Sequence, residues 1–328
     1  MAGFAPFLAD AGVALDYRPG LTEGEYAFVA SDASAPRKAV TLIRSAWRSV
    51  RQSPDEYDVR LVYRLRSLVP LPGVESWRAA EVYDFDDALF LGSISTANTG
   101  FGWIKREAKR SVAYMRAARL VIAGNSYLAD RAAEYAKRVE VIPSCVDTER
   151  QPLREHERRD PITVGWIGSP STSGYLQAVL PVFERINRDR LRARLLVIGA
   201  DPGHRAPWLE WRAWSLSAER ADLASFDVGI MPLRDSEWER GKCGYKLLQY
   251  FSAGVPAVAS PVGVNRTLVA EDRGILASSP GEWERALELL IEDVGLRRSC
   301  GAAARAYVER EFSYPRWAPA LAELLRSV

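Results

Sequence analysis

Cysteine and histidine are both scarce in this chain of 328 residues, which has three cysteines and two histidines. The cysteines (Cys145, Cys243 and Cys300) are odd in number and far apart. That pattern fits neither a disulfide framework nor a zinc site. His156 and His204 both lie in loop-like segments, which argues against a catalytic centre built on histidine.

Long apolar runs and a charge excess are also missing. No run approaches the ~18 apolar residues of a membrane span, and the N-terminus lacks a signal-peptide pattern, so we expect a cytoplasmic protein. A net charge of +2 argues against a dedicated nucleic-acid binder. Hydrophobic residues at 48% and charged residues at 26% are typical of a globular protein, and the length allows two domains.

Apolar segments of strand and helix type alternate along the whole chain, which predicts parallel sheets covered by helices. Strands are expected at 26–30, 59–63, 81–84, 120–123, 139–143, 162–167, 193–198, 227–232 and 256–260. Helices are expected at 39–52, 104–118, 126–137, 173–187, 218–225, 245–252, 281–292, 296–311 and 318–325.

The segment QPLREHERRD (151–160) is charged and has no apolar period, so we interpret it as an interdomain linker. This predicts an N-terminal domain over residues 1–153 and a C-terminal domain over 154–312. The last segment, 313–328, is expected to form a helix that crosses back to the first domain.

Residues 226–265 are the most informative stretch. They read as a buried strand, a polar loop that opens onto a helix, a helix-stopping Ala253-Gly254 and a second buried strand. The chain has six lysines, and two of them lie in this loop, Lys242 and Lys246, close to Arg240 and Gly244. Glycines let backbone N–H groups approach a phosphate, and a helix N-terminus adds partial positive charge. We interpret the loop as a diphosphate-binding loop; the alternative is a solvated basic turn.

A second loop, GWIGSPSTSGY (165–175), also follows a buried strand and precedes a helix. Gly165, Gly168, Ser169 and Thr172 offer backbone freedom, hydroxyl donors and a helix cap. Since both loops leave the carboxyl ends of strands in one domain, they can face one ligand. Without a ligand, the second loop is a well-capped turn.

Two sequence segments resemble the nucleotide-sugar-binding region of retaining GT-B glycosyltransferases, family four (the glycosyl transferases of group 1) in particular. They are DVGIMPL and ERGKCGYKLLQYFSAGVPAVASPVGVN. EVYDFDDALF, VIAGNSYLA, VIPSCVD and VGWIGSPSTSGYL follow the family's order and spacing. The resemblance runs from about Phe4 to Val328 and is more specific in the second half. It implies two Rossmann-like doubly wound parallel-sheet domains that face each other. The opening GFAPFLADAGVALDY corresponds to the end of the family's first helix, so either the first strand is absent or the true start lies upstream.

The resemblance also implies an activity, transfer of a sugar from a nucleotide-diphosphate donor, such as a UDP-sugar, to an acceptor, without a cofactor or a metal. Since no apolar run could span a membrane, we expect peripheral membrane contact at most, and the subunit alternative given below allows a protein partner or an oligomer. The donor-binding residues that it implies are Gly165, Gly168, Ser169, Thr172, Arg240, Lys242, Gly244, Tyr245, Lys246, Leu247 and Gln249. Lys246 is expected to contribute to catalysis by neutralising the leaving diphosphate.

Two features depart from the family pattern. Family four commonly places an arginine and a lysine around the first loop, whereas this chain does not, so Lys242 and Lys246 are the expected substitutes. The family's two glutamates, eight residues apart, correspond here to Gly241 and Gln249. Glu237 or Glu239 could replace the first of them, or both could be exposed loop acids.

In the first half, DFDD (84–87) ends an apolar strand, and three carboxylates there need solvent, partners or a function. We expect Asp86 or Asp87 to bind sugar hydroxyls or to orient the acceptor; a metal site and simple turn caps are the alternatives. Gly124 and Asn125 are expected to line the interdomain cleft, although helix capping would also explain Asn125.

Two further alternatives stay open. The basic helix 106–120 could contact a membrane or an anionic acceptor, or it could be a solvated helix face. The chain could also be a non-catalytic GT-B subunit that supports a partner transferase, or a nucleotide-sugar epimerase.

Overall fold

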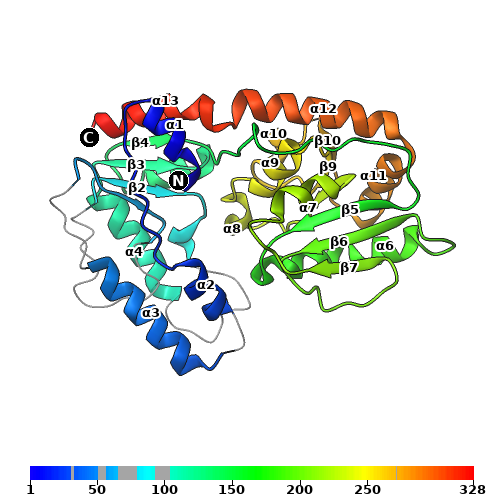
Figure 1. The fold of residues 1–328 in the computed structure, drawn as a ribbon, viewed down its shortest axis with the longest axis horizontal. Coiled ribbons are helices and arrows are strands. Elements are labelled where there is room, and N and C mark those ends of the chain that lie inside the picture. The colour runs from blue at the N-terminus through cyan, green and yellow to red at the C-terminus, as the bar shows by residue number, and fades with distance from the viewer. Residues whose placement is uncertain (31–32, 51–56, 66–79, 93–103, 271) are drawn as a thin grey trace. The chain divides into compact units, whose positions relative to one another are not determined.

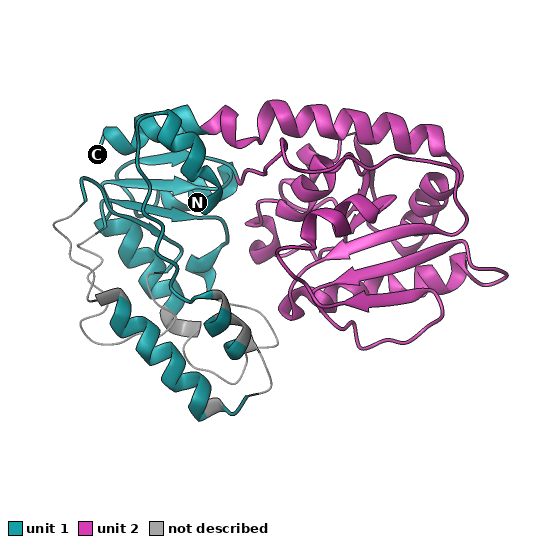
Figure 2. Cartoon of the chain, in the orientation of Figure 1, with its two compact units in different colours: residues 1–143, 318–328 teal, residues 144–317 magenta. Residues whose placement is uncertain are grey.

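A computed structural model describes residues 1–30, 33–50, 57–65, 80–92, 104–270 and 272–328. The chain divides into two compact units (Figure 2). Unit 1 comprises Met1–Pro143 and Ala318–Val328, and unit 2 comprises Ser144–Trp317. The sequence placed the first boundary after residue 153, but the change of unit occurs at Ser144 because the following segment packs with unit 2.

Unit 1 contains a four-stranded parallel sheet in the order β1-β2-β3-β4 (Figure 1). Its strands are β1 (Leu61–Tyr63), β2 (Val82–Phe85), β3 (Leu120–Ala123) and β4 (Val139–Val141). Its helices are η1 (Ala2–Phe4), α1 (Ala5–Asp10), α2 (Glu23–Ala30), α3 (Ala35–Val50), η4 (Leu89–Leu91), α4 (Ile104–Ala117) and α5 (Ser126–Ala132). β2 and β3 are fully buried, as near-continuous apolar runs in a parallel sheet should be.

The strand expected at residues 26–30 is wrong, because this segment is helix α2. The Thr22 side chain accepts a hydrogen bond from the Glu25 backbone N–H at 3.3 Å, and the Glu25 carboxylate accepts one from the Thr22 N–H at 2.8 Å. This reciprocal arrangement is a capping box, which starts a helix. The pattern Thr-x-x-Glu before the apolar run was therefore the signal that the strand assignment missed.

Unit 2 contains a six-stranded parallel sheet in the order β10-β9-β8-β5-β6-β7. The strands are β5 (Ile162–Ile167), β6 (Ala193–Ile198), β7 (Leu209–Arg212), β8 (Val228–Met231), β9 (Ala257–Ala259) and β10 (Gly274–Leu276). In chain order within the unit this is 6-5-4-1-2-3, the doubly wound topology expected of a Rossmann-like domain. β7 and β10 were not foreseen, since β7 is an exposed edge strand and β10 has only three residues.

The helices of unit 2 cover both faces of its sheet. They are η6 (Pro170–Ala178), α6 (Leu180–Ile186), α7 (Glu219–Ser225), α8 (Glu237–Arg240), α9 (Tyr245–Ser252), α10 (Asn265–Leu268), α11 (Pro280–Glu292) and α12 (Val294–Glu311). One core joins β5 to α6 and α11, and the other joins the opposite face to α7, α9 and α12. The chain returns to unit 1 within α13 (Tyr314–Arg326), where the division falls at Ala318.

The helix expected at 173–187 is interrupted in the structure. A 3-10 segment, η6, precedes α6, and Pro181 occupies the first turn of α6. Proline has no N–H to continue a preceding helix, so a new helix starts there. The helix expected at 126–137 is also shorter than predicted, since α5 ends at Ala132.

Residues 151–160 pack into unit 2, so the linker interpretation is wrong. Arg154 donates to the Asp227 carboxylate at 2.6 and 3.1 Å, with its side chain 9% exposed and that of Asp227 1% exposed. The same carboxylate accepts the Thr163 N–H at 2.8 Å. Buried charges occur where they are paired in this way. The pairing partner lies 73 positions away in the chain, so the segment itself gives no sign of its burial.

His156 belongs to the same packed segment and is buried. Its Nε2 lies 2.9 Å from the Gly254 carbonyl oxygen, so Nε2 carries the proton and donates it to that carbonyl. Protonation of the ring would place a charge in the interior, and burial lowers the pKa of His156 below its ordinary value of 6.5.

The free energy of unfolding of unit 2 should fall as the pH falls below 6.5. In that range His156 binds a proton in the unfolded chain more readily than in the native protein. The lowered native pKa gives this sign, because the unfolded state then binds more protons in that window. His156→Gln, which keeps a donor for Gly254, should flatten the pH dependence of the unfolding free energy. Nuclear magnetic resonance of the two histidine rings measures the pKa directly, with His204→Gln for assignment. A His156 pKa at or above 6.5 would contradict the argument.

The basic helix 106–120 corresponds to α4 and the start of β3. Arg110 is only 5% exposed, and Tyr114 and Met115 are buried beside it. Tyr114 stacks on Tyr83 of β2 with ring centroids 5.3 Å apart. This side of α4 is therefore packed against the sheet, whereas the basic residues Lys109 and Arg116 are exposed. Among the described residues, no helix has the length and apolar character needed to cross a membrane.

Candidate functional site

The carboxyl ends of β5 and β8 form the topological switch point of unit 2. The ladder between these strands pairs Val164 with Val228 and Gly165 with Gly229. Beyond it, the Tyr250 hydroxyl of α9 accepts the Ile167 N–H and donates to the Ile230 carbonyl, each at 3.2 Å. The hydroxyl thus forms a hydrogen bond with one backbone group of each strand, at the point where the two strands separate. Ligands of doubly wound sheets bind at such a point, outside the carboxyl ends of the strands.

Lys246 and Gly168 bring the two predicted loops together at this point. The Lys246 Cε lies 2.9 Å from the position that a Cβ on Gly168 would occupy, and Trp166 ring atoms lie within 2.7 Å of that position. The Lys246 Nζ is 5.2 Å from the centroid of the Trp166 ring. Gly168 is therefore needed for close packing. The side chain of Lys246, in the first turn of α9, lies against Gly168 and the Trp166 ring.

Gly244 starts α9 in a left-handed conformation, with φ of +69°. A Cβ here would lie 2.3 Å from Leu268 Cδ1 and 3.1 Å from Val264 Cγ2. Glycine is thus required both by the backbone angle and by the packing of α10. The first turn of α9 contains no acidic residue, so its partial positive charge is not offset from within the helix.

Gly244→Ala should lower the free energy of unfolding by about 2–4 kcal/mol, combining left-handed strain with overpacking. Gly203→Ala is a matched control, since Gly203 has the same φ of +69° and no atom within 4 Å of its would-be Cβ. That variant should show the strain alone, about 1–2 kcal/mol. Denaturant titration of both variants measures the difference. Equal losses in the free energy of unfolding would show that the Leu268 and Val264 side chains move aside at little cost.

Glu239 ties the same two loops together through hydrogen bonds. Its buried carboxylate, 8% exposed, accepts hydrogen bonds from the Tyr175 hydroxyl of η6 and the Ser236 hydroxyl at the start of α8. The expectation that it could be an exposed loop acid is wrong for Glu239, whereas Glu237 is exposed. Tyr175 was missed because its partner lies 64 residues further along the chain.

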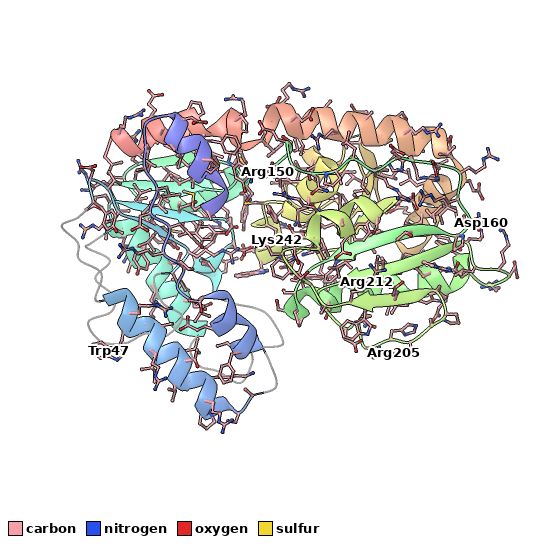
Figure 3. The ribbon with its side chains drawn as sticks, viewed as in Figure 1. Trp47, Arg150, Asp160, Arg205, Arg212 and Lys242 are labelled. Carbon is pink, nitrogen blue, oxygen red and sulfur yellow. The ribbon has the colours of Figure 1, made fainter. Side chains whose placement is uncertain are left out.

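The other basic-loop residues lie around α8 and α9. Arg240 donates to the Asp235 carboxylate at 2.7 Å, so its charge is shared with an acid. Lys242, labelled in Figure 3, has its Nζ 5.9 Å from the Trp238 ring centroid. Tyr245 is 46% exposed at the start of α9. Lys242, Tyr245 and Lys246 therefore present a cationic and aromatic surface beside the switch point.

The loop after β5 keeps the hydroxyl groups that the sequence analysis singled out. The Ser169 and Ser171 hydroxyl oxygens are 2.8 Å apart, and the Thr172 hydroxyl donates to the Ser169 carbonyl at 3.0 Å. Ser169 is exposed and Thr172 half-buried. These hydrogen bonds lie within the turn that directly follows Gly168, and they stabilise its conformation.

Three predicted donor-binding residues lie in the interior. Gly165 is buried within β5, where a Cβ would come within 2.1 Å of the Phe226 ring. Leu247 is fully buried in the core, and Gln249 is 6% exposed within α9. The structure brings Gly168 against Lys246 and Tyr175 against Glu239, but it gives Gly165 and Leu247 packing roles.

Unit 1 has its own polar cluster at the carboxyl edge of its sheet. Arg64, directly after β1, donates to Asp86 and Asp87 at 2.6 Å each, and the Tyr63 hydroxyl donates to Asp86 at 2.6 Å. Arg64 has a positive φ of 59°, uncommon for a residue with a side chain. Arg64 was not foreseen, although a basic residue after one strand and acidic residues after the next were visible signals in the sequence.

The carboxylates of this cluster differ in charge. Burial, and next the charge of Asp86, raise the pKa of Asp84 to about 7. Burial opposes ionisation of Asp86, but the charge of Arg64 and the hydrogen bonds from Arg64 and Tyr63 outweigh it and lower its pKa. Asp86 is thus a charged, oriented acceptor for hydrogen bonds, whereas Asp84 binds a proton more readily than an ordinary aspartate.

Gly124 and Asn125 follow β3 at the same edge of the sheet. The Asn125 side chain accepts the Leu128 N–H at 2.8 Å and so caps α5, and the Gly124 N–H donates to the Phe85 carbonyl at 3.0 Å. Capping therefore accounts for Asn125. Within the described ranges, no group of three or more histidine, cysteine or acidic side chains is placed to hold a metal ion.

Residues 161–293 match the family described as glycosyl transferases group 1. The match is under half of the chain, and it runs from the start of β5 through α11, including both loops of the switch point. The resemblance inferred from the sequence is confirmed for this stretch. No curated protein matches the chain.

Solved structures share the fold at low identity. Sucrose-phosphate synthase from Thermosynechococcus elongatus superposes with a TM-score of 0.67 at 14% identity, over 91% of this chain and 81% of that one. Anabaena HepE, solved with UDP and glucose, gives 0.64 at 16%, over 98% and 89%. WaaG, a glycosyltransferase involved in lipopolysaccharide biosynthesis, gives 0.62 at 12%, over 100% and 95%. The expected fold of two Rossmann-like parallel-sheet domains, GT-B, is confirmed.

Proposed function

We propose that this chain, with a group 1 glycosyltransferase stretch in unit 2 and the GT-B fold, transfers a sugar from a nucleotide-diphosphate donor to a hydroxyl group. The observation that carries the proposal is the packing of Lys246 against Gly168 and Trp166 at the switch point. It brings a cation, a glycine-rich turn and a helix N-terminus to one place. Those are the groups that bind a diphosphate.

In this proposal the donor diphosphate lies beside Lys242, Lys246 and the first turn of α9. As the bond between the sugar carbon and the diphosphate oxygen breaks, negative charge grows on that oxygen. Cations and helix dipoles already in place stabilise this charge more than the ground state, which is how they accelerate the reaction. The acceptor oxygen bonds to the same carbon, and its proton passes to the departing diphosphate.

Retention of the anomeric configuration would follow if the acceptor enters on the face that the diphosphate leaves. No protein nucleophile is required by that route. The charged Asp86, held by Arg64 and Tyr63, is our candidate for binding hydroxyl groups of the sugar or the acceptor. Asp87 would serve mainly to position Arg64, with which it pairs.

UDP is the nucleotide that we favour, since HepE, a protein of the same fold, was solved with UDP and glucose. A thermal-shift screen of the whole chain against UDP, GDP, ADP and dTDP tests the proposal. A ligand at about 100 times its dissociation constant should stabilise unit 2 by ~2.7 kcal/mol. A shift with one diphosphate supports the site and identifies the base, whereas no shift with any of them contradicts it.

A non-catalytic subunit is the second candidate, favoured by Gly241 and Gln249 at the positions of the family's glutamates. Gln249 is buried in α9 and has no carboxylate to offer a reacting sugar. Donor binding without release of the nucleoside diphosphate, in the presence of varied hydroxyl acceptors, would favour this role over the transferase.

A further inference from the structure

Strand β7 is the last strand of the sheet in unit 2, and its residues are exposed. In the described strand order it has β6 on one side and no strand on the other (Figure 1). Trp211, in the strand, is 42% exposed, and Trp214 and Leu216, just beyond it, are 44% and 64% exposed. Single exposed apolar residues are ordinary, but three large ones beside a free strand edge indicate an interaction surface.

The backbone of β7 shows which groups point to its outer edge. The Trp208 and Arg212 carbonyls accept hydrogen bonds from the Leu195 and Gly199 N–H groups, each at 2.8 Å, so they point towards β6. Within a strand, the backbone groups of successive residues point to alternate edges. The N–H and the carbonyl of Trp211 therefore point away from β6. Two antiparallel copies of the strand could exchange both hydrogen bonds at this residue.

The charges on either side of Trp211 are opposite in sign. Glu210 and Arg212 lie on the same face of the strand, where the Arg212 Nε donates to the Glu210 carboxylate at 2.8 Å. Their side chains are 51% and 50% exposed. In an antiparallel pair centred on Trp211, Glu210 of each copy lies directly opposite Arg212 of the other. Cross-strand pairs of opposite charge stabilise a sheet, so this edge is complementary to itself.

We propose that the chain forms a twofold dimer in which β7 pairs antiparallel with β7 of a second copy, centred on Trp211. The pairing joins the two parallel sheets into one continuous sheet through their edge strands. It brings the two Trp211 side chains next to each other, and aromatic pairs on one face add to the stability of a sheet. A closed twofold interface uses the same surface on both partners, as this one does. The inference does not depend on the transferase proposal, since it rests on β7 alone.

A second copy fits this edge better than an extended segment of another protein. Such a segment could also add a strand to a free edge. It would require no relation between the charges of Glu210 and Arg212. Their opposite signs, one residue to each side of Trp211, are what a twofold axis at that residue requires. The charge pattern of β7 therefore favours self-association.

Light scattering of the whole chain during gel filtration, without nucleotide, tests the proposal. The measured mass should approach twice the chain mass of 36.5 kDa as the protein concentration rises. Glu210→Arg places arginine opposite arginine in both cross-strand pairs, and Arg212→Glu places glutamate opposite glutamate. Each variant should raise the dissociation constant of the dimer by about tenfold or more.

Combinations of the two charge changes should restore the dimer. An equal mixture of Glu210→Arg and Arg212→Glu should form a mixed dimer, because the arginines of one chain then face the glutamates of the other. The double variant exchanges the two charges within one chain, so it should dimerise like the wild type. A variant that is merely misfolded would not recover in either way.

Two control variants separate β7 from the rest of the surface. Glu157→Arg is matched to Glu210→Arg, since Glu157 pairs with Arg159 at the same spacing of two residues and their side chains are 59% and 47% exposed. It should leave the dimer intact. Trp211→Ser should weaken the dimer, whereas Trp47→Ser, at a tryptophan of α3 that is 53% exposed, should not.

A wild-type chain that stays monomeric at all concentrations would overturn the proposal, and so would a dimer that persists in both single charge variants. Failure of the mixture and of the double variant to dimerise, when the single variants are folded, would show that the charges do not face each other as proposed. The thermal shift with nucleoside diphosphates tests the diphosphate site separately, so either proposal can fail while the other stands.

Discussion

Lys246→Met is expected to reduce kcat/KM for the sugar donor by about 100-fold or more, because one charged group that stabilises the leaving diphosphate is lost. Methionine keeps a long apolar stem against Trp166 and Gly168, where the lysine stem packs. The variant therefore removes the charge while preserving most of the packing. Lys246→Ala, which removes both, should be at least as severe.

Calorimetry with the diphosphate found in the thermal screen measures how much of this loss comes from weaker binding. The rate at which that diphosphate is released during turnover measures how much comes from a slower reaction. Lys137→Ala is the control, since Lys137 is an exposed lysine of unit 1. It should change neither quantity. Similar losses in the two variants would show that Lys246 acts only through the overall charge of the protein, and the diphosphate site would then lie elsewhere.

Asp227→Asn is expected to destabilise unit 2 by about 3–5 kcal/mol, because it leaves the Arg154 charge buried without its partner. The asparagine side chain can still accept the Thr163 N–H, so the loss reports the charge pair rather than the backbone contact. Arg154→Met should be destabilising for the complementary reason. The double variant should cost less than the sum of the two, since neither buried charge remains.

Urea unfolding of the four proteins provides the double-mutant cycle. Glu157→Gln is the control in the same segment, because the Arg159–Glu157 pair has side chains 47% and 59% exposed. A pair that exposed should contribute about 0–1 kcal/mol. If Asp227→Asn costs no more than Glu157→Gln, the segment 151–160 opens readily in solution, and the linker interpretation would regain support.

The sequence was sufficient for most of the sheet architecture. The strands at 120–123, 162–167 and 193–198 and the helix at 245–252 were predicted with the observed ends. These elements are buried apolar runs or end at a glycine, and such signals lie within a few residues of one another. The loops at the carboxyl ends of β5 and β8 follow directly from them, so Gly168, Lys242 and Lys246 could be proposed from the sequence alone.

What the sequence determined by itself was therefore local: apolar periodicity, chain-breaking glycines and the cations of one loop. The tertiary structure decided which polar groups meet. Arg154 with Asp227, Tyr175 with Glu239, and Arg64 with Asp86 are separated by 73, 64 and 22 positions in the chain. The same is true of exposure, since α3 has the amphipathic pattern of a packed helix but turns Val40, Ile43 and Trp47 outward. Periodicity defines a face of a helix, whereas the surrounding fold decides whether that face is covered.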